Sequence, residues 1–304
     1  MYKTLLFYKY VSVKDSEGFV QEHLQFCKDL KVQGRILVGK EGINGSLSGT
    51  EKQINTYMKE LRKYPEFSDI TFKVGSSKDH IFQKMHVRTR DEICVLNLKK
   101  DVDPSKETGT YIAPEEFKKL MESNEDFVII DARNDYEWKV GKFKNAVTLD
   151  IEYFRDFPEK IKEIEKYKDK KVVTYCTGGI RCEKASALLK REGFKNVYQL
   201  EGGILNYSAQ TDGSYFEGKC FMFDDRLVVP INKKEKKIIS QCFHCKQPSD
   251  RFMNCPNIEC NKLYICCEAC DKKHQGFCCE ECTKAKRIRD RRPVGVPSDH
   301  WELV

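Results

Sequence analysis

The sequence predicts an α/β protein made of an α+β unit, a unit with a parallel sheet, and a cysteine-rich module. Three observations predict this organisation. Strand-like and helix-like segments alternate through residues 1–98, and continuous apolar runs alternate with helical segments through residues 111–215. Ten of the fifteen cysteines then fall between Cys242 and Cys282. A chain of 304 residues is long enough for two or three such units.

Residues 1–98 are expected to form the first domain, because their segments follow the order β-α-β-β-α-β. The expected strands are residues 3–13, 35–38, 45–48 and 70–74, and the expected amphipathic helices are residues 17–30 and 53–61. This order is that of a ferredoxin-like, or acylphosphatase-like, sandwich. In residues 85–98 the alternation of His86, Arg88 and Arg90 places three basic groups on one face of a further strand.

Residues 111–215 are predicted to form a second domain with a parallel sheet, after a linker at residues 99–110. Three apolar runs, residues 127–130, 172–175 and 197–200, are typical of strands covered on both faces. Residues 114–121 and 183–192 are expected to be helices. Parallel sheets bind ligands at the carboxyl ends of their strands, and Cys176 directly follows the second apolar run.

Cys176 opens a tight loop, Cys-Thr-Gly-Gly-Ile-Arg-Cys at residues 176–182, between that strand and a helix. A thiol is nucleophilic only as the thiolate, so a catalytic cysteine needs surroundings that lower its pKa. A helix N-terminus and loop N–H groups supply such surroundings, and Gly178 and Gly179 permit the close turn that they require. Arg181 adds a positive charge. The alternative interpretation is an inert buried cysteine beside an ordinary Gly-Gly turn.

The spacing within this loop indicates the class of reaction. Cysteine-based phosphatases place their arginine one residue later than Arg181 is placed here, in a loop sized for a phosphate group. In this chain Cys182 occupies that later position. The loop is therefore interpreted as one sized for sulfur, and a phosphatase is disfavoured.

Several motifs, taken in order, resemble the rhodanese signatures. They are Asp-Ala-Arg at residues 131–133, Glu137, residues 141–146, the loop at residues 176–182, and Leu-Glu-Gly-Gly-Ile at residues 200–204. Four further features are more selective for one family among the rhodanese-like proteins. They are the loop sequence continued to residue 186, Arg-Ile-Leu-Val at residues 35–38, Glu-Gly-Ile-Asn-Gly at residues 41–45, and the cysteine-rich tail. With these motifs, the chain resembles the bacterial rhodanese-domain tRNA uridine hydroxylases over nearly its whole length.

The resemblance implies a function. That family is associated with oxygen-dependent formation of 5-hydroxyuridine at the wobble position of tRNA, so tRNA is the expected partner. No flavin motif and no iron-binding triad is visible in the sequence, and no organic cofactor is expected. The alternative function for the same loop is a sulfurtransferase, a persulfide carrier that delivers sulfur to tRNA or to a protein acceptor. A non-enzymatic zinc adaptor would leave the Cys176 loop unexplained.

The resemblance also assigns catalytic roles. Cys176 would be the persulfide-bearing or redox-active nucleophile, with the charge of Arg181 beside it. Cys182 either resolves an oxidised Cys176 as a disulfide or packs as a small residue in the first turn of the helix. Asp131 and Arg133 are expected to brace the sheet by an ion pair rather than to touch substrate.

Residues 216–292 are predicted to form a cysteine-rich zinc module with a basic tail. Four closely spaced cysteine pairs can supply two tetrahedral all-cysteine zinc sites, which are structural. The expected arrangement is interleaved, with one site made by Cys242, Cys245, Cys267 and Cys270 and the other by Cys255, Cys260, Cys279 and Cys282. The remaining candidates in the module are spare or alternative ligands, and iron–sulfur ligation stays open: Cys266, Cys278, His244 and His274.

Composition permits a polyanionic partner and predicts a cytoplasmic location. The net charge is +7, and six basic residues follow the last cysteine pair: Lys284, Lys286, Arg287, Arg289, Arg291 and Arg292. The N-terminal apolar run is short, is interrupted by lysines and lacks a cleavage site. No stretch approaches the ~20 apolar residues of a membrane helix. In a reducing compartment the cysteines are expected to be metal ligands or catalytic thiols rather than disulfides.

Overall fold

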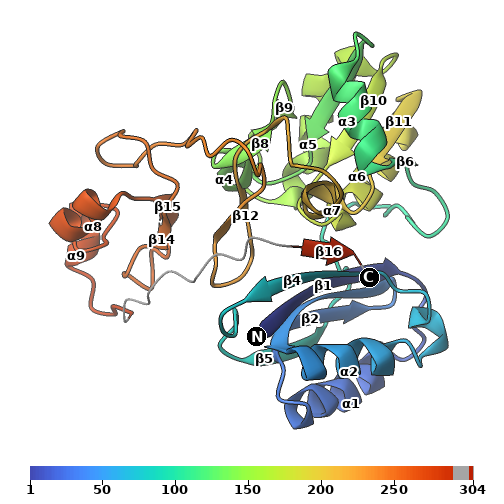
Figure 1. Ribbon diagram of the computed structural model, residues 1–304, viewed down its shortest axis with the longest axis horizontal. Helices are drawn as coiled ribbons and strands as arrows, with labels where there is room; N and C mark the ends of the chain where they lie inside the picture. Colours follow the sequence, from blue (N-terminus) through green and yellow to red (C-terminus); the bar gives the residue numbers. More distant parts are fainter. Residues whose placement is uncertain (290–300, 304) are drawn as a thin grey trace.

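The computed structural model describes residues 1–289 and 301–303, and the three predicted parts can be followed in Figure 1. The N-terminal sheet lies beneath the parallel-sheet domain, and helices α1 (Ser16–Asp29) and α2 (Glu51–Leu61) cover its far face. The cysteine-rich module projects to one side. Among the described residues, no helix is both long enough and apolar enough to cross a membrane.

The N-terminal domain is a ferredoxin-like sandwich, as predicted. Its central strands follow the order β4-β1-β3-β2, and each neighbouring pair is antiparallel. The elements are β1 (Tyr2–Tyr10), β2 (Gln33–Gly39), β3 (Gly42–Thr50), the 3₁₀ turn η1 (Pro65–Phe67) and β4 (Phe72–Ser77). Strand β5 (Met85–Thr89) adds to β2 in parallel, so Arg90 lies just beyond its end. The backbone of β16 (Trp301–Leu303), a strand that was not predicted, adds to β4.

Alternation along β1 gives the N-terminal sheet two different faces. Leu5 and Phe7 are fully buried in the apolar core shared with the two helices. Leu6 and Tyr8 point to the opposite face, which carries no helix and meets the parallel-sheet domain. The helix-free face of this sheet is therefore one wall of the interface between the two domains.

The central domain has a sheet of order β6-β11-β10-β7-β9 in which every neighbouring pair is parallel, which confirms the predicted class. Its strands are β6 (Thr110–Ile112), β7 (Phe127–Asp131), β9 (Val147–Thr148), β10 (Lys171–Tyr175) and β11 (Asn196–Leu200). Its helices are α3 (Pro114–Glu122), α4 (Asp135–Trp138), α5 (Phe157–Ile164), α6 (Ile180–Arg191) and α7 (Gly203–Gln210), with 3₁₀ turns η2 (Phe154–Asp156) and η3 (Glu165–Tyr167). Separate apolar cores fill the two faces of the sheet.

Helix α6 begins at Ile180, earlier than the expected start at residue 183. Gly179 precedes it with a φ of 104°, a conformation that glycine adopts far more readily than other residues. The chain therefore turns from β10 into α6 within a very short loop. As a result, Arg181 and Cys182 lie in the first turn of the helix and not in the loop before it.

A small antiparallel sheet of order β13-β12-β8 joins the central domain to the cysteine-rich module. Its strands are β8 (Gly141–Phe143), β12 (Phe216–Phe221) and β13 (Val228–Pro230), and the module contains β14 (Phe252–Asn254), β15 (Leu263–Ile265), α8 (Glu268–His274) and α9 (Glu280–Thr283). Phe221 and Phe252 pack edge to face across the junction, with ring centroids 5.1 Å apart. The module is thus docked on the central domain through a small apolar contact.

Candidate active site and cysteine clusters

Cys176 is fully buried and directly follows β10, at the carboxyl end of the central sheet. The N–H of Gly179 donates to its Sγ at 3.1 Å. Helix α7 fixes the loop backbone, because the N–H groups of Ile204 and Leu205 donate to the carbonyls of Cys176 and Thr177 at 3.0 and 3.1 Å. The loop backbone is therefore fixed with N–H groups directed at the sulfur.

The surroundings of Cys176 favour the thiolate. Burial alone would raise the pKa of the thiol, but a hydrogen bond from Cys182, the charge of Arg181 and the backbone N–H groups of Gly179 and Arg181 together lower it to about 5. The thiol is therefore ionised at neutral pH, as a nucleophilic cysteine requires.

Arg181 is buried and paired with the carboxylate of Glu137 from α4. Both guanidinium nitrogens donate to this carboxylate, and the Nη2–Oε1 distance is 2.8 Å. The Glu137 carboxylate also accepts from the hydroxyl of Thr177 at 3.3 Å and thus contacts the loop itself. The bidentate pair fixes the predicted cation beside Cys176. Glu137 was seen in the sequence only as part of a motif, and its contact with Arg181 could not be inferred from spacing.

Cys182 is also fully buried, and its thiol hydrogen-bonds to Cys176. Burial, followed by the hydrogen bond and the charge of Cys176, raises the pKa of Cys182 well above its ordinary value. The pKa values of the two loop cysteines are thus shifted in opposite directions, which favours the thiolate at Cys176 and the S–H form at Cys182.

Asp131 and Arg133 lie behind the loop and are both fully buried. The Arg133 side chain donates two hydrogen bonds of 2.9 and 2.7 Å to Asp131, its backbone N–H donates a third of 3.0 Å, and its guanidinium also donates to the carbonyl of Gly141 at 2.7 Å. These contacts connect the end of β7 to β8. The pair has the bracing geometry that the sequence analysis expected.

The helix-free face of the N-terminal sheet packs directly on the loop glycines. A Cβ atom at Gly178 would lie 2.8 Å from a methyl carbon of Leu6, and one at Gly179 would lie 2.7 Å from the hydroxyl of Tyr8. Side chains at these two positions would therefore collide with the N-terminal domain. The glycines serve this domain contact in addition to the turn.

Two buried side chains of α6 fix the N-terminal domain over the loop. Glu183 accepts a hydrogen bond from the hydroxyl of Tyr8 at 2.9 Å. Lys184 is fully buried and pairs with three carboxylates from the N-terminal domain and the linker, at 2.9, 2.6 and 2.9 Å: Glu41, Glu92 and Asp101. The helix that carries the loop is thus tied to the domain that covers it. Sequence reasoning missed these contacts because they join residues far apart in the chain.

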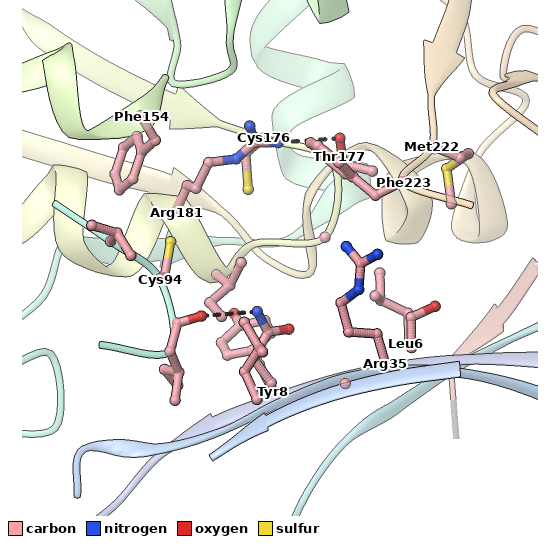
Figure 2. Close-up of a pocket in the computed structure, with 18 of the residues that line it drawn as sticks. Leu6, Tyr8, Arg35, Cys94, Phe154, Cys176, Thr177, Arg181, Met222 and Phe223 are labelled. Atoms are coloured by element: carbon pink, nitrogen blue, oxygen red, sulfur yellow. Dashed lines mark hydrogen bonds between the residues drawn. The ribbon is translucent and has the colours of Figure 1, made fainter. Parts of the chain in front are cut away.

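A cavity of about 440 Å³ lies between the loop and the N-terminal sheet, with Cys176 in its wall. In Figure 2, Cys176, Thr177 and Arg181 lie on one side, and Leu6, Tyr8 and Arg35 rise from the strands below. Most of the lining is apolar, and a few polar side chains interrupt it. This arrangement is typical of a small-molecule or single-base pocket.

Two aromatic side chains and two arginines are exposed at the cavity, and the guanidinium of Arg155 lies over the ring of Tyr153, 4.4 Å from its centroid. Tyr153 and Phe223 are 46% and 54% exposed, and both line the cavity. Arg35 is exposed on β2, and within residues 1–289 no carboxylate pairs with it. Its guanidinium points toward the loop side of the cavity in Figure 2. Flat apolar faces beside an unpaired cation suit a nucleotide.

The structure gathers cysteine sulfurs into two groups of four, and each group lies within 4.8 Å. The first group contains the four residues expected for one site: Cys242, Cys245, Cys267 and Cys270. The second group contains Cys255, Cys260, Cys278 and Cys282. The pairs are interleaved along the chain as expected, first with third and second with fourth.

Cys278, and not the expected Cys279, belongs to the second group. Cys279 is exposed and lies outside the group of four, although its Sγ is 3.9 Å from that of Cys278. Cys278 is the buried one, with its Sγ 3.6 Å from that of Cys260 and 3.7 Å from that of Cys282. Cys266 stays outside both groups. His244 and His274 also stay outside and stack with ring centroids 4.1 Å apart.

The sulfur spacings fit a tetrahedral metal ion. Zinc–sulfur bonds of about 2.3 Å give a tetrahedron with sulfur–sulfur edges of about 3.8 Å. The Cys245–Cys267 distance in the first group is 3.7 Å, and the distances in the second are 3.6 and 3.7 Å. Either group of four thiols could hold a metal ion of this size.

The first residues of the basic tail lie against the second cysteine group. The N–H of Ile258 donates to the carbonyl of Arg287 at 3.1 Å, and the N–H of Arg289 donates to the carbonyl of Pro256 at 2.9 Å. This segment of the tail therefore follows the metal-binding loop. The last two arginines of the predicted tail, at residues 291 and 292, lie outside the described residues.

Comparison with known proteins covers all three parts of the chain. Residues 2–93 match the UPF0176 acylphosphatase like domain, residues 113–210 the rhodanese-like domain, and residues 217–283 the family described as rhodanase C-terminal. The tRNA uridine(34) hydroxylase of Bacillus licheniformis is 48% identical over 284 residues, which cover 92% of this chain and 88% of that protein.

Two further relatives carry the same name. The tRNA uridine(34) hydroxylase of Cytophaga hutchinsonii is 49% identical over 281 residues, covering 92% of this chain and 89% of that protein. The one from Staphylococcus aureus strain N315 is 48% identical over 304 residues, covering 99% and 95%. The likeness extends through the loop, the covering domain and the cysteine-rich module together.

Proposed function

The chain belongs to the family of tRNA uridine(34) hydroxylases, and we propose that it hydroxylates the wobble uridine through Cys176. The observation that most strongly supports Cys176 is its thiolate, with a pKa lowered to about 5, in the wall of a cavity of about 440 Å³. A cavity of this size admits one nucleoside and excludes a base-paired stem. The product would be 5-hydroxyuridine at the wobble position of tRNA.

The substrate base enters this cavity from the anticodon loop. Bases in single-stranded loops can be unstacked and held against aromatic side chains. Tyr153 and Phe223 offer such faces at the cavity, for the wobble base or for its neighbour. Arg35 can donate to a phosphate or carbonyl oxygen of the same nucleotide, which would position the RNA.

Cys176 and Cys182 supply the two electrons that hydroxylation by molecular oxygen requires. In the net reaction, the C5–H bond of uracil and the O–O bond break, and a C5–O bond and a disulfide form. The second oxygen atom leaves as water, with one proton from the Cys182 thiol and one from solvent. An external thiol then reduces the disulfide. The contact between the two cysteines and their oppositely shifted pKa values support this pairing.

A sulfurtransferase that carries a persulfide is the second candidate function for the same loop. A persulfide on Cys176 would meet the loop N–H groups that now face its Sγ, and the domain matches the rhodanese-like family. A sulfurtransferase of this kind would deliver sulfur to tRNA or to a protein acceptor. It would change the thiolated nucleosides of tRNA and not the hydroxylated ones.

Zinc is the metal proposed for both cysteine groups, as a structural ion. Four thiolates close a tetrahedral site and leave no position for substrate, so the ion holds the module's loops together and takes no part in the reaction. The second ion would fix the loop against which the basic tail lies. We infer a cytoplasmic location, which reduced thiols and a tRNA substrate would both support.

Nucleoside analysis of tRNA from cells that lack the gene tests the proposed function. Loss of 5-hydroxyuridine and its derivatives, restored by the wild-type gene, is the expected result. Restoration by Cys27→Ala, which removes a buried thiol from the N-terminal core, controls for a general effect of losing a cysteine. Unchanged 5-hydroxyuridine together with lost thiolated nucleosides would favour the sulfurtransferase.

A further inference from the structure

We propose that Asn134 makes the cavity selective for uridine, by accepting a hydrogen bond from N3–H of the base. The inference rests on the proposed function and names the group that recognises its substrate. Asn134 lines the cavity and is only 6% exposed. Its Oδ1 is buried, and no donor within the described part of the chain reaches it.

The rest of the Asn134 residue is engaged. Its Nδ2 donates to the hydroxyl of Tyr136 at 2.6 Å, and its backbone N–H donates to Oε2 of Glu137 at 3.1 Å. These two contacts fix the direction of the amide and leave the oxygen for a ligand. The free oxygen is unusual for this position, because an asparagine that precedes a helix ordinarily accepts an N–H from the first turn. A buried acceptor without a donor is destabilising, which favours a functional reason for keeping it.

Asn134 belongs to the same hydrogen-bonded assembly as the loop. Glu137, which holds its backbone, also holds Arg181 and the hydroxyl of Thr177. The free oxygen is thus fixed relative to Cys176 through short contacts and lines the same cavity. A base held by this oxygen would lie in the same cavity as the reactive sulfur.

Compared with three other polar groups of the cavity, Asn134 is well suited to accept a hydrogen bond from N3–H of the base. The carboxylate of Asp224 is already paired with Arg226, and the amide of Asn44, whose Nδ2 donates to the carbonyl of Ile93 at 3.0 Å, belongs to the N-terminal sheet on the side of the cavity away from the loop. Arg35 can only donate, so it suits a carbonyl or phosphate oxygen.

Uracil and cytosine differ at the atom that such an acceptor would meet. Uracil presents an N3–H donor between two carbonyl oxygens, whereas cytosine presents an unprotonated N3 and an amino group. A fixed buried carbonyl oxygen forms a hydrogen bond with the first and faces a lone pair of the second. Sites that leave a buried polar group unpaired reject the wrong ligand strongly. The oxygen of Asn134 is therefore expected to admit uridine and exclude cytidine.

The test measures the binding of anticodon stem-loop RNAs that carry either uridine or cytidine at position 34 to the full-length protein. The wild type should prefer the uridine RNA by about 10-fold, the size expected for one buried hydrogen bond and the repulsion that replaces it. Asn134→Ala should weaken binding of the uridine RNA and bring the ratio of the affinities for the uridine and cytidine RNAs close to one. Asn134→Asp, which keeps an acceptor, should bind both RNAs more weakly but retain the preference.

Tyr136→Phe is the matched control for positioning, because it removes only the hydroxyl that holds the amide. It should give a preference between that of the wild type and that of Asn134→Ala. Thermal unfolding of each variant shows whether it is folded. An Asn134→Ala protein with the wild-type ratio would overturn the inference even if the wild type hydroxylates uridine 34 in cells. A wild type that selects uridine but leaves tRNA unhydroxylated would refute the proposed function instead.

Discussion

Replacing Cys182 with alanine tests how the loop ionises Cys176. The surroundings lower the pKa of Cys176 from 9.0 to about 5, although burial by itself would raise it. At 1.36 kcal/mol per pKa unit, this difference corresponds to on the order of 5 kcal/mol in favour of the folded thiolate. The hydrogen bond from the Cys182 thiol is the largest of the lowering causes, ahead of Arg181 and the loop N–H groups.

A hydrogen bond to a charged group contributes ~1.5–3 kcal/mol. Its loss in Cys182→Ala should therefore raise the pKa of Cys176 by about 1 to 2. The folded pKa lies below the unfolded one, so the thiolate stabilises the fold fully above pH 9 and this stabilisation is lost as the pH falls toward 5. The variant should have about 1.5–3 kcal/mol less of this stabilisation and should lose the remainder at a higher pH than the wild type.

Alkylation of Cys176 by iodoacetamide, followed by peptide mass spectrometry from about pH 4 to pH 9, measures this pKa. The wild-type rate should level off above about pH 6, and the Cys182→Ala rate should level off only about 1 to 2 pH units higher. Cys27→Ala is the control, since that thiol lies in the N-terminal core, where burial raises its pKa to about 12. A wild-type profile that rises until about pH 9, or identical profiles for wild type and Cys182→Ala, would refute this account of the loop.

Three further predictions concern the loop, the metal ions and the basic tail. Gly179→Ala should abolish uridine hydroxylation, because its φ is 104° and a Cβ there would lie 2.7 Å from the Tyr8 hydroxyl, whereas Gly193→Ala, at a φ of 90° in open space, should retain it. Elemental analysis should find about two zinc ions per chain, about one in Cys278→Ala, and still about two in Cys279→Ala; equal loss in both variants would contradict the ligand assignment. Affinity for tRNA should fall steeply with salt, and replacing the described basic residues of the tail with alanine should flatten that dependence; an unchanged slope would exclude them from the RNA-binding surface.

The sequence was sufficient for features that depend on local pattern. The buried run before Cys176 indicated a parallel strand, and the structure has that strand ending at Tyr175. The close spacing of Cys242 and Cys245 indicated two ligands of one site, and the structure brings them together with Cys267 and Cys270. Both inferences rest on residues close together in the chain, where spacing constrains geometry.

Features that depend on side-chain direction or on distant contacts could not be predicted. Cys278 is buried and belongs to the second group of four whereas Cys279 is exposed, and two adjacent cysteines in a sequence give no signal for that difference. The contacts of Tyr8 with Glu183 and of Glu137 with Arg181 join segments separated by 175 and 44 residues. The unpaired oxygen of Asn134 emerges only when all of its neighbours are placed.

Conversion of Cys176 to serine tests the central claim most directly. The hydroxyl of serine has a far higher pKa than a thiol, so it leaves almost no anion and cannot form a disulfide with Cys182. The measurement is the 5-hydroxyuridine content at position 34 of tRNA from cells that carry only the variant gene, with tRNA binding and thermal unfolding of the purified protein measured alongside. We expect the modified nucleoside to disappear while tRNA binding stays close to that of the wild type and the variant remains folded, with an unfolding temperature lowered by the loss of the thiolate. Wild-type levels of 5-hydroxyuridine with Cys176→Ser would show that the chemistry occurs elsewhere in the chain.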